Sequence, residues 1–224
     1  MPLVADQVFG SLLEAVLTGR YAPGEKLPGQ RALAPDLGVT LSSVREALKR
    51  LEQMGLVDVR HGDAMRVRPW REHGGLDVLV HVLFAGGGVD AAVLRDVLDA
   101  RALMLREVAG LAAERGRPEH AARLAELAAG FAAAGEDRRA TALIDLSFFT
   151  EVARAADNVV FDLILNAIRG IYLEHLDLVP VTVRAGELAP LYARVAAAVA
   201  EGDAATARDA AYELACRQRE RVLG

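Results

Sequence analysis

Apolar residues recur at helical spacing through most of the chain, and one segment also carries a polar and basic face. Val44, Leu48 and Leu51 recur at i, i+4 and i+7, so they occupy one face of a predicted helix. Polar residues elsewhere on that helix then lie on its exposed surface: Ser42, Ser43, Arg45, Lys49 and Arg50. Short hydroxyls and guanidinium groups on one helix surface are typical of a helix that enters the major groove of DNA.

The boundaries of this helix follow from residues that favour helix ends. Thr40 is a candidate N-cap, although Ser43 with Glu46 also fits the spacing of a capping box. Gly55 is the expected C-terminal stop. The helix therefore covers about residues 41 to 54, with a start that is open by one turn.

Further elements are predicted on both sides of it. Residues 30–37 predict a short helix that ends at Gly38 and that Pro35 shortens or kinks. Upstream, a stripe at i, i+4 spacing predicts another helix: Val4, Val8, Leu12 and Val16. Downstream, polar and apolar residues alternate in 57–60 and 65–68, which predicts a two-stranded wing. Together these elements predict a winged helix-turn-helix domain in residues 1–70.

The second half of the chain predicts only helices. Residues 71–77, rich in Gly, are expected to form a linker, and residues 78–224 an all-α domain. Ala- and Leu-rich segments predict a short helix near 76–84 and six more near 90–115, 118–134, 137–156, 158–178, 187–201 and 203–221. The fold class is therefore mainly α, a winged domain followed by an antiparallel helical bundle.

Composition and charge limit the classes of protein to consider. The chain has 224 residues, of which 53% are hydrophobic and 25% charged, so it is expected to be globular. Neither a membrane span nor a signal peptide is indicated, and the lone Cys216 forms no internal disulfide, so a cytoplasmic protein is expected. The net charge of −5 divides into +1 for residues 1–70 and −6 for residues 71–224. The excess of acidic residues therefore lies outside the predicted DNA-binding domain.

A set of motifs runs in order and without gaps through residues 3–68. It consists of the Pro-Gly-x-x-Leu-Pro turn at 23–28, Arg31, 33–34, 37–40, 44–48, Leu51 and 55–57. In these motifs the segment resembles the N-terminal domain of the GntR family of bacterial transcription regulators. The resemblance implies DNA contacts from Arg31, Thr40, Ser42, Ser43, Arg45 and the wing pair His61 and Gly62, and the exposed Lys49 is added from the helix pattern. Leu41 stands where the family usually has an arginine, and Gly29-Gln30 replaces the usual Ser-Glu, so weaker DNA binding or a different operator is expected.

A second set of motifs lies in the predicted bundle: Asp99-Ala-Arg101, 145–149 followed by 156–158, and 198–203 followed by Ala207. With these motifs, and in the order and lengths of its helices, residues 76–222 resemble the FadR-type C-terminal domain of these regulators, called FCD. In many FCD domains an Asp and three His hold a divalent metal. Asp145 keeps the Asp position here, whereas Phe149, Tyr192 and Leu214 take the three His positions. Because phenyl and isobutyl groups cannot replace imidazole, no metal and no other cofactor is expected.

Six residues are candidates for an effector pocket in the predicted bundle: Arg101, Asp145, Phe149, Asn166, Tyr192 and Leu214. Two interpretations of the polar members stay open. Asp145 either pairs with a helix-borne arginine such as Arg101 in a structural role, or it contacts an effector, and the same alternatives apply to Asn166 and Tyr192. Any effector is expected to be an organic acid of apolar or aromatic character.

The predicted function is an effector-responsive transcription regulator that binds an inverted-repeat operator as a homodimer, with repression favoured over activation by family habit. One alternative is a degenerate member that acts as an interaction protein. Another is an all-α enzyme, but the sequence shows no nucleophile–base pair and no Gly-rich phosphate loop for it. The expected partners are double-stranded DNA, a small-molecule effector and a second copy of the chain, with no membrane.

Overall fold

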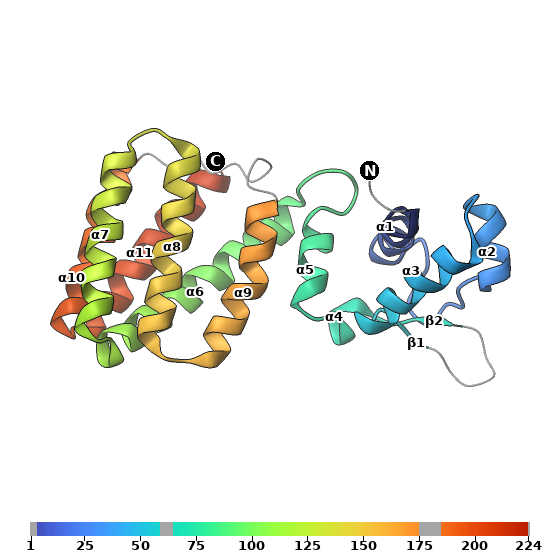
Figure 1. Cartoon of the computed structure of the whole chain (residues 1–224), viewed down its shortest axis with the longest axis horizontal. Helices are drawn as coiled ribbons and strands as arrows, with labels where there is room; N and C mark the ends of the chain where they lie inside the picture. The colour runs from blue at the N-terminus through green and yellow to red at the C-terminus, as the bar shows by residue number, and fades with distance from the viewer. Residues whose placement is uncertain (1–3, 59–64, 175–184, 224) are drawn as a thin grey trace. The chain divides into compact units, whose positions relative to one another are not determined.

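The computed structural model of the chain describes residues 4–58, 65–174 and 185–223 (Figure 1). Their contacts divide the chain into two compact units, Met1–Asp90 and Ala91–Gly224. Helices dominate both units, which confirms the predicted mainly α fold class.

The first unit contains three helices, a short antiparallel strand pair and two further helices. In chain order these are α1 Val4–Leu17, α2 Gln30–Asp36, α3 Leu41–Gln53, β1 Val57–Asp58, β2 Arg66–Val67, α4 Trp70–His73 and α5 Leu76–Leu83. Helix α3 packs against both α1 and α2. The predicted stripe of Val44, Leu48 and Leu51 is at most 2% exposed and forms the centre of this core. On α1 the predicted stripe is buried except for Val4 at its start.

The ends of α3 agree with the caps expected from the sequence. The backbone N–H of Ser43 donates to the Thr40 side chain at 3.2 Å, so Thr40 is the N-cap and the alternative start at Ser43 is wrong. Gly55 follows the helix with a φ of +73°, a conformation that residues with a side chain rarely adopt. A Cβ atom at Gly55 would lie 2.6 Å from the carbonyl oxygen of His73, so both the backbone angle and the close approach require glycine.

The predicted wing forms, and a third segment joins it. β1 and β2 pair antiparallel, with Val57 opposite Val67. The Pro-Gly turn segment lies along the other edge of β2: Gly24 N donates to Val67 O at 2.8 Å, and Leu27 N donates to Met65 O at 2.8 Å. Backbone hydrogen bonds therefore tie the wing to the turn before α2. The wing residues His61 and Gly62 lie outside the described residues.

The segment expected to be a linker is partly helical. Residues 70–73 form α4, and the predicted first helix of the second domain, α5, belongs to the first unit and contacts α1. Val78 on α5 is 2% exposed, and the His81 ring meets the Phe9 ring edge-on at 5.9 Å. The contacts therefore divide the chain at 90–91 rather than within the linker expected at 71–77, because the apolar face of α5 is buried on α1.

The described part of the second unit consists of six helices: α6 Ala91–Arg115, α7 Pro118–Ala134, α8 Arg138–Ala156, α9 Val159–Glu174, α10 Ala185–Glu201 and α11 Ala204–Leu223. Each agrees within a few residues with a predicted helix, although the predicted end of the helix near 158–178 lies outside the described residues. Helix α6 packs on α8 and α11, α10 packs on α7 and α11, and α9 contacts α8 (Figure 1).

Small residues allow α6 and α11 to approach closely. Ala109 and Ala112 on α6, and Ala207, Ala210 and Ala211 on α11, are fully buried. An aromatic cluster fills the space where α7, α8 and α10 meet. The rings of Phe131 and Tyr192 stack at 4.0 Å, and Phe148 meets Tyr192 edge-on at 5.0 Å. Within the described residues, no helix combines the length and apolar composition needed to cross a membrane.

Candidate nucleic-acid interface and a buried polar cluster

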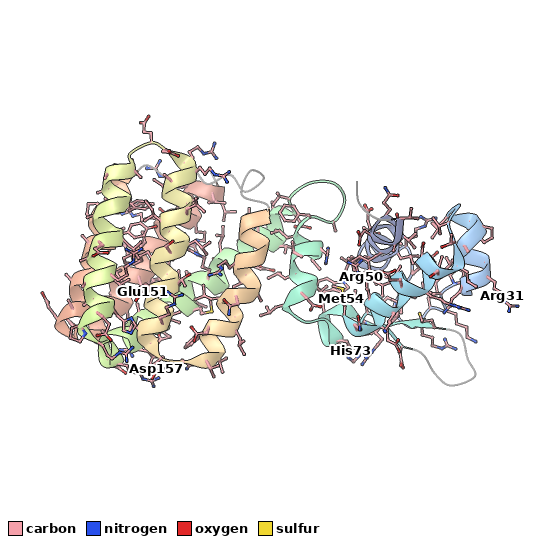
Figure 2. All side chains as sticks on the ribbon, viewed as in Figure 1. Arg31, Arg50, Met54, His73, Glu151 and Asp157 are labelled. Atoms are coloured by element: carbon pink, nitrogen blue, oxygen red, sulfur yellow. The ribbon has the colours of Figure 1, made fainter. Side chains whose placement is uncertain are left out.

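The surface of α3 that faces away from its core carries most of the residues expected to contact DNA. Thr40, Ser42, Arg45 and Lys49 are exposed, and Ser43 is half-buried. Arg31 is exposed on α2 and projects outward from that helix (Figure 2). The apolar stripe that packs α3 against α1 and α2 therefore turns these polar side chains toward solvent. Leu41, which stands at the usual arginine position, is half-buried in the first turn of α3.

Arg45 is held in place by a residue of the neighbouring helix. Its Nε donates to Oε1 of Gln30 at 3.1 Å, across the turn between α2 and α3. No hydrogen bond from the described residues occupies its two terminal nitrogens, which stay available to a phosphate or a base edge. From the sequence, Gln30 was noted only as a departure from the family pattern. Its contact with Arg45 depends on how α2 and α3 pack.

Three other arginines of this unit have structural partners. Arg50, which was expected on the exposed surface of α3, pairs with Asp6 of α1 at 2.8 Å and lies over the Phe9 ring at 3.9 Å. Arg66 donates to the carbonyl of Gly24 at 3.0 Å, and Arg68 lies 2.8 Å from Nδ1 of His73. Fewer positive side chains are therefore available to DNA on the helix-turn-helix surface than the sequence indicates. Those available are mainly Arg31, Arg45 and Lys49.

In the second unit, four polar side chains from four helices meet inside the bundle. Asp145 of α8 accepts hydrogen bonds from the Tyr192 hydroxyl, from Nε2 of Gln218 at 2.8 Å and from Arg101 at 3.2 Å. Arg101 also donates to Oε1 of Gln218 at 2.6 Å, and Gln218 donates to the Tyr192 oxygen at 2.9 Å. We call these four residues, Arg101, Asp145, Tyr192 and Gln218, the polar cluster.

The polar cluster satisfies its own hydrogen-bonding groups. Tyr192 is fully buried and Asp145 is 8% exposed, so each lost partner here would leave a polar atom away from water. Among the described residues, every buried side-chain nitrogen and oxygen has a partner. Of the two interpretations of Asp145, the structure shows the pairing with Arg101. The buried polar atoms of the cluster are therefore bonded to one another.

The remaining pocket candidates divide between the bundle interior and its surface. Phe149 and Leu214 are buried, and the Arg101 guanidinium lies 5.0 Å from the centre of the Phe149 ring. Asn166 is exposed on α9 and does not join the polar cluster. Gln218 was missed from the sequence, although it lies one helical turn after Leu214 and so shares its face of α11.

At the position where many FCD domains hold a metal, the residues of this chain do not fit a divalent cation. Asp145 is already bonded to three donors, the Tyr192 hydroxyl donates to it, and Phe149 and Leu214 carry no ligand atom. In the described ranges, no group of three or more His, Cys, Asp or Glu side chains could hold a metal ion.

Two family models match the chain over these two regions. The model described as "Bacterial regulatory proteins, gntR family" matches residues 4–67, and the FCD domain matches residues 96–215. The chain belongs to the GntR family of bacterial transcription regulators, in its FCD-containing class. GntR regulators of this class bind DNA and are not enzymes, and small-molecule effectors bind at their FCD domain.

Individual relatives agree with the family. The HTH-type transcriptional regulator Mce2R of Mycobacterium tuberculosis is 41% identical over 215 residues, which cover 94% of this chain and 88% of that protein. The fatty acid metabolism regulator protein of Edwardsiella ictaluri is 28% identical over 161 residues, which cover 72% of this chain and 66% of that protein.

Solved structures share the fold. Lar, described as controlling the expression of the Listeria monocytogenes agr system, has a TM-score of 0.61 at 16% identity over 99% of this chain and 97% of that one. Streptococcus agalactiae GntR has a TM-score of 0.50 at 24% identity over 97% of this chain and 100% of that one.

Proposed function

We propose that this GntR regulator is a homodimeric repressor that binds an inverted-repeat operator through α3 and is released by an organic acid. The observation that carries the proposal is the placement of Arg45, which is exposed and whose Nε is held by Gln30. A guanidinium that is already positioned loses less conformational entropy when it contacts DNA.

The proposed DNA contacts come from the exposed side of the helix-turn-helix. Ser42, Ser43 and Arg45 lie within the first five residues of α3, where the recognition helix of such domains meets base edges. The full set of proposed contacts is Arg31, Thr40, Ser42, Ser43, Arg45 and Lys49, with His61 and Gly62 of the wing as further predictions.

We propose a dimer because a single domain carries little positive charge. Residues 1–70 carry a net charge of +1, and three of their arginines have structural partners. Two domains on two half-sites double the number of phosphate contacts and match an inverted repeat. Because bacterial DNA is the target, we place the protein in the cytoplasm.

We infer an effector that is an organic acid with an apolar or aromatic body. Phe149 and Leu214, together with the self-satisfied polar cluster, make the bundle interior less polar than a metal site with three imidazoles. The similarity to a protein named as a fatty acid metabolism regulator supports an acid of this kind. Binding of such an acid in the FCD domain shifts the equilibrium between forms with high and low affinity for the operator.

The test begins with selection of bound duplexes from random DNA, followed by fluorescence anisotropy of the selected operator over a series of salt concentrations. We expect a palindromic site, a steep loss of affinity as salt rises, and a particle of twice 23.9 kDa in sedimentation. Transcription from a template that carries the operator should fall when the protein is added.

Arg45→Ala is expected to weaken operator binding by more than about 1 kcal/mol and to reduce the salt dependence. The matched control is Arg139→Ala, which removes the same charge from an exposed position at the start of α8. No selective binding to any duplex, or an equal effect of both substitutions, would contradict the proposed interface and favour the interaction-protein alternative.

A further inference from the structure

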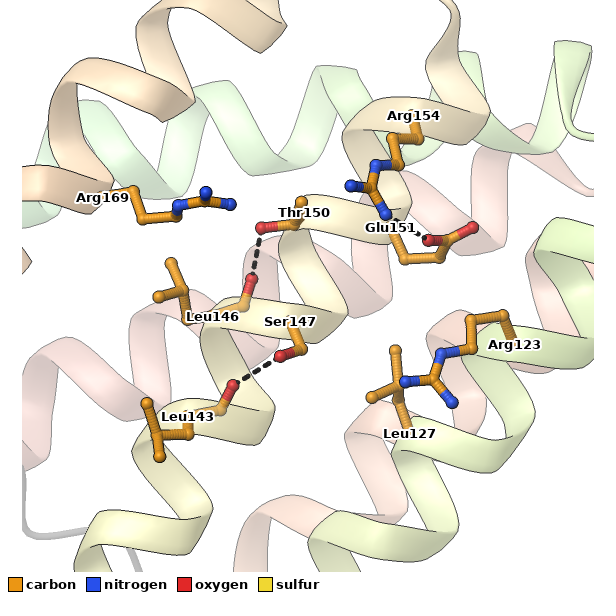
Figure 3. A pocket seen from close by; sticks show the side chains of 9 residues that line it. All are labelled: Arg123, Leu127, Leu143, Leu146, Ser147, Thr150, Glu151, Arg154 and Arg169. Atoms are coloured by element: carbon orange, nitrogen blue, oxygen red, sulfur yellow. Dashed lines mark hydrogen bonds and ion pairs between the residues drawn. The ribbon is translucent and has the colours of Figure 1, made fainter. Parts of the chain in front are cut away.

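A surface groove runs along α8 on the side opposite to the polar cluster. Asp145 and Phe149 face the interior of the bundle, whereas Leu143, Ser147 and Thr150 line the groove. Residues of α7 and α9 form its two sides, and its volume is about 370 Å³ (Figure 3). An adjoining hollow between α8 and α9, of about 320 Å³, shares Thr150, Arg154 and Arg169 with it. Both volumes lie at the lower end of the range of about 300 to 1,000 Å³ that is typical of small-molecule sites.

Three arginines from three helices line this groove. Arg123 of α7 pairs with Glu126 at 2.8 Å, so its charge is already balanced. Arg154 of α8 reaches Glu151 only at 3.4 Å and is 63% exposed. Arg169 of α9 has no partner among the residues that the structure describes, and its guanidinium points toward Thr150 (Figure 3). One free guanidinium and one weakly held guanidinium therefore flank the same space.

The acidic residues of the lining offset only part of this charge, because three arginines and two carboxylates line the two hollows. Glu151 is 8% exposed, and its other oxygen lies 2.7 Å from Nδ1 of His120, so it is engaged on both sides. Asp162 lines only the adjoining hollow. An incoming anion therefore meets positive charge where the two hollows join.

The rest of the groove is apolar and supplies few free donors. Leu127, Leu143 and Leu146 line it, and Leu143 is 39% exposed. The hydroxyls of Ser147 and Thr150 donate to backbone carbonyls of their own helix, at 2.8 and 2.7 Å (Figure 3). Recognition of a negative group must therefore come from the arginines, and the leucines favour a ligand with an apolar body.

We propose that this groove binds a monocarboxylate with an extended apolar body. The carboxylate lies between Arg154 and Arg169, where a guanidinium can donate two parallel hydrogen bonds, and the apolar body lies along Leu143 and Leu146. The ligand would connect α9, which packs mainly on α8, to the rest of the bundle. Asn166, an effector-pocket candidate that lies outside the polar cluster, lines the adjoining hollow and so belongs to this site.

The direct test uses the full-length protein without DNA and isothermal titration calorimetry with three probes. Octanoate combines charge with an apolar chain, acetate carries the charge alone and 1-octanol carries the chain alone. We expect octanoate to bind at least about tenfold more tightly than either of the others. Equal affinity for acetate and octanoate, or no octanoate binding at millimolar concentration, overturns the proposal.

Substitutions then locate the site. Arg169→Gln is expected to weaken octanoate binding roughly 10- to 100-fold, because it removes hydrogen bonds to a charged group. Arg139→Gln is the matched control, since it removes an exposed arginine near the start of α8 that does not line the groove. Both positions are exposed, so thermal melts should show a folded protein. An equal loss in the control, or binding that survives Arg169→Gln, overturns the site.

The groove lies on the side of α8 opposite to the bundle interior, from which the apolar character of the effector was inferred. It is therefore a separate site for the class of acid named in the proposed function, on which this inference rests, and the two claims fail separately. Octanoate binding that depends on Arg169 supports the groove even if the protein binds no operator. Selective operator binding by a protein that ignores octanoate supports the regulator and overturns the groove.

Discussion

Removing the Asp145 carboxylate tests whether the polar cluster is a structural element of the bundle. Asp145→Ala deletes the acceptor for Tyr192, Gln218 and Arg101 at once. Breaking a buried ion pair costs about 3 to 5 kcal/mol. The Arg101 side chain is 22% exposed and keeps its bond to Gln218. We therefore expect the free energy of unfolding to fall by about 3 kcal/mol, the low end of that range. For a protein of this size that corresponds to a melting temperature lower by about 6 to 12 °C.

The assay is thermal and urea unfolding followed by circular dichroism, with and without a metal chelator. We expect the transition of the second unit to shift in Asp145→Ala and the wild-type transition to be unaffected by the chelator. Asp209→Ala is the matched control, because Asp209 is an exposed aspartate of α11 with no partner among the described residues. Its effect should stay within about 0.5 kcal/mol.

A specific pair of results would refute this reasoning. If the chelator lowers the melting temperature of the wild-type protein, and Asp145→Ala abolishes that sensitivity, then Asp145 is a metal ligand and the polar cluster is not its native arrangement. A variant as stable as the wild type would equally show that the three hydrogen bonds do not stabilise the bundle.

Two further predictions concern the winged domain, and both are measured by its urea unfolding transition. Thr40→Ala removes the N-cap of α3 and should cost about 0.5 to 2 kcal/mol; an unchanged midpoint would mean that another group caps the helix. Gly55→Ala should lower the free energy of unfolding by more than about 1 kcal/mol, because the φ of Gly55 is +73° and a Cβ there would meet the His73 carbonyl. Gly10 lies in the middle of α1 with open space around it, so Gly10→Ala should raise the free energy of unfolding by about 0.5 to 1 kcal/mol. The same sign for both glycine substitutions would contradict this account.

The secondary structure was largely predictable because its signals are local. The spacing of Val44, Leu48 and Leu51 places the core face of α3, and Thr40 and Gly55 mark its ends through contacts within a few residues. The helices of the bundle agree with their Ala- and Leu-rich segments for the same reason. The exposed positions of Arg45 and Lys49 follow once the buried stripe is known, because residues that lie off this stripe are on the solvent-facing side of the helix.

Other features depend on contacts between residues far apart in the sequence. Arg50 and Arg45 lie on the same short helix, yet Asp6 and Phe9 hold the first against α1 while Gln30 holds the second from α2. Nothing in the local pattern separates the two arginines. The grouping of α5 with the first unit likewise depends on the α1 surface that its apolar face meets.

The same division holds for the second unit. Sequence reasoning could bring Asp145, Tyr192 and Arg101 together as candidates and could exclude imidazole ligands, since residue type alone settles which donor atoms exist. It could not tell whether the aspartate is free or already paired, nor that Gln218 joins it, because hydrogen bonds among side chains 26 to 117 residues apart require the packed helices. Helix periodicity is encoded residue by residue, whereas the partner of a polar side chain is settled only when distant helices meet.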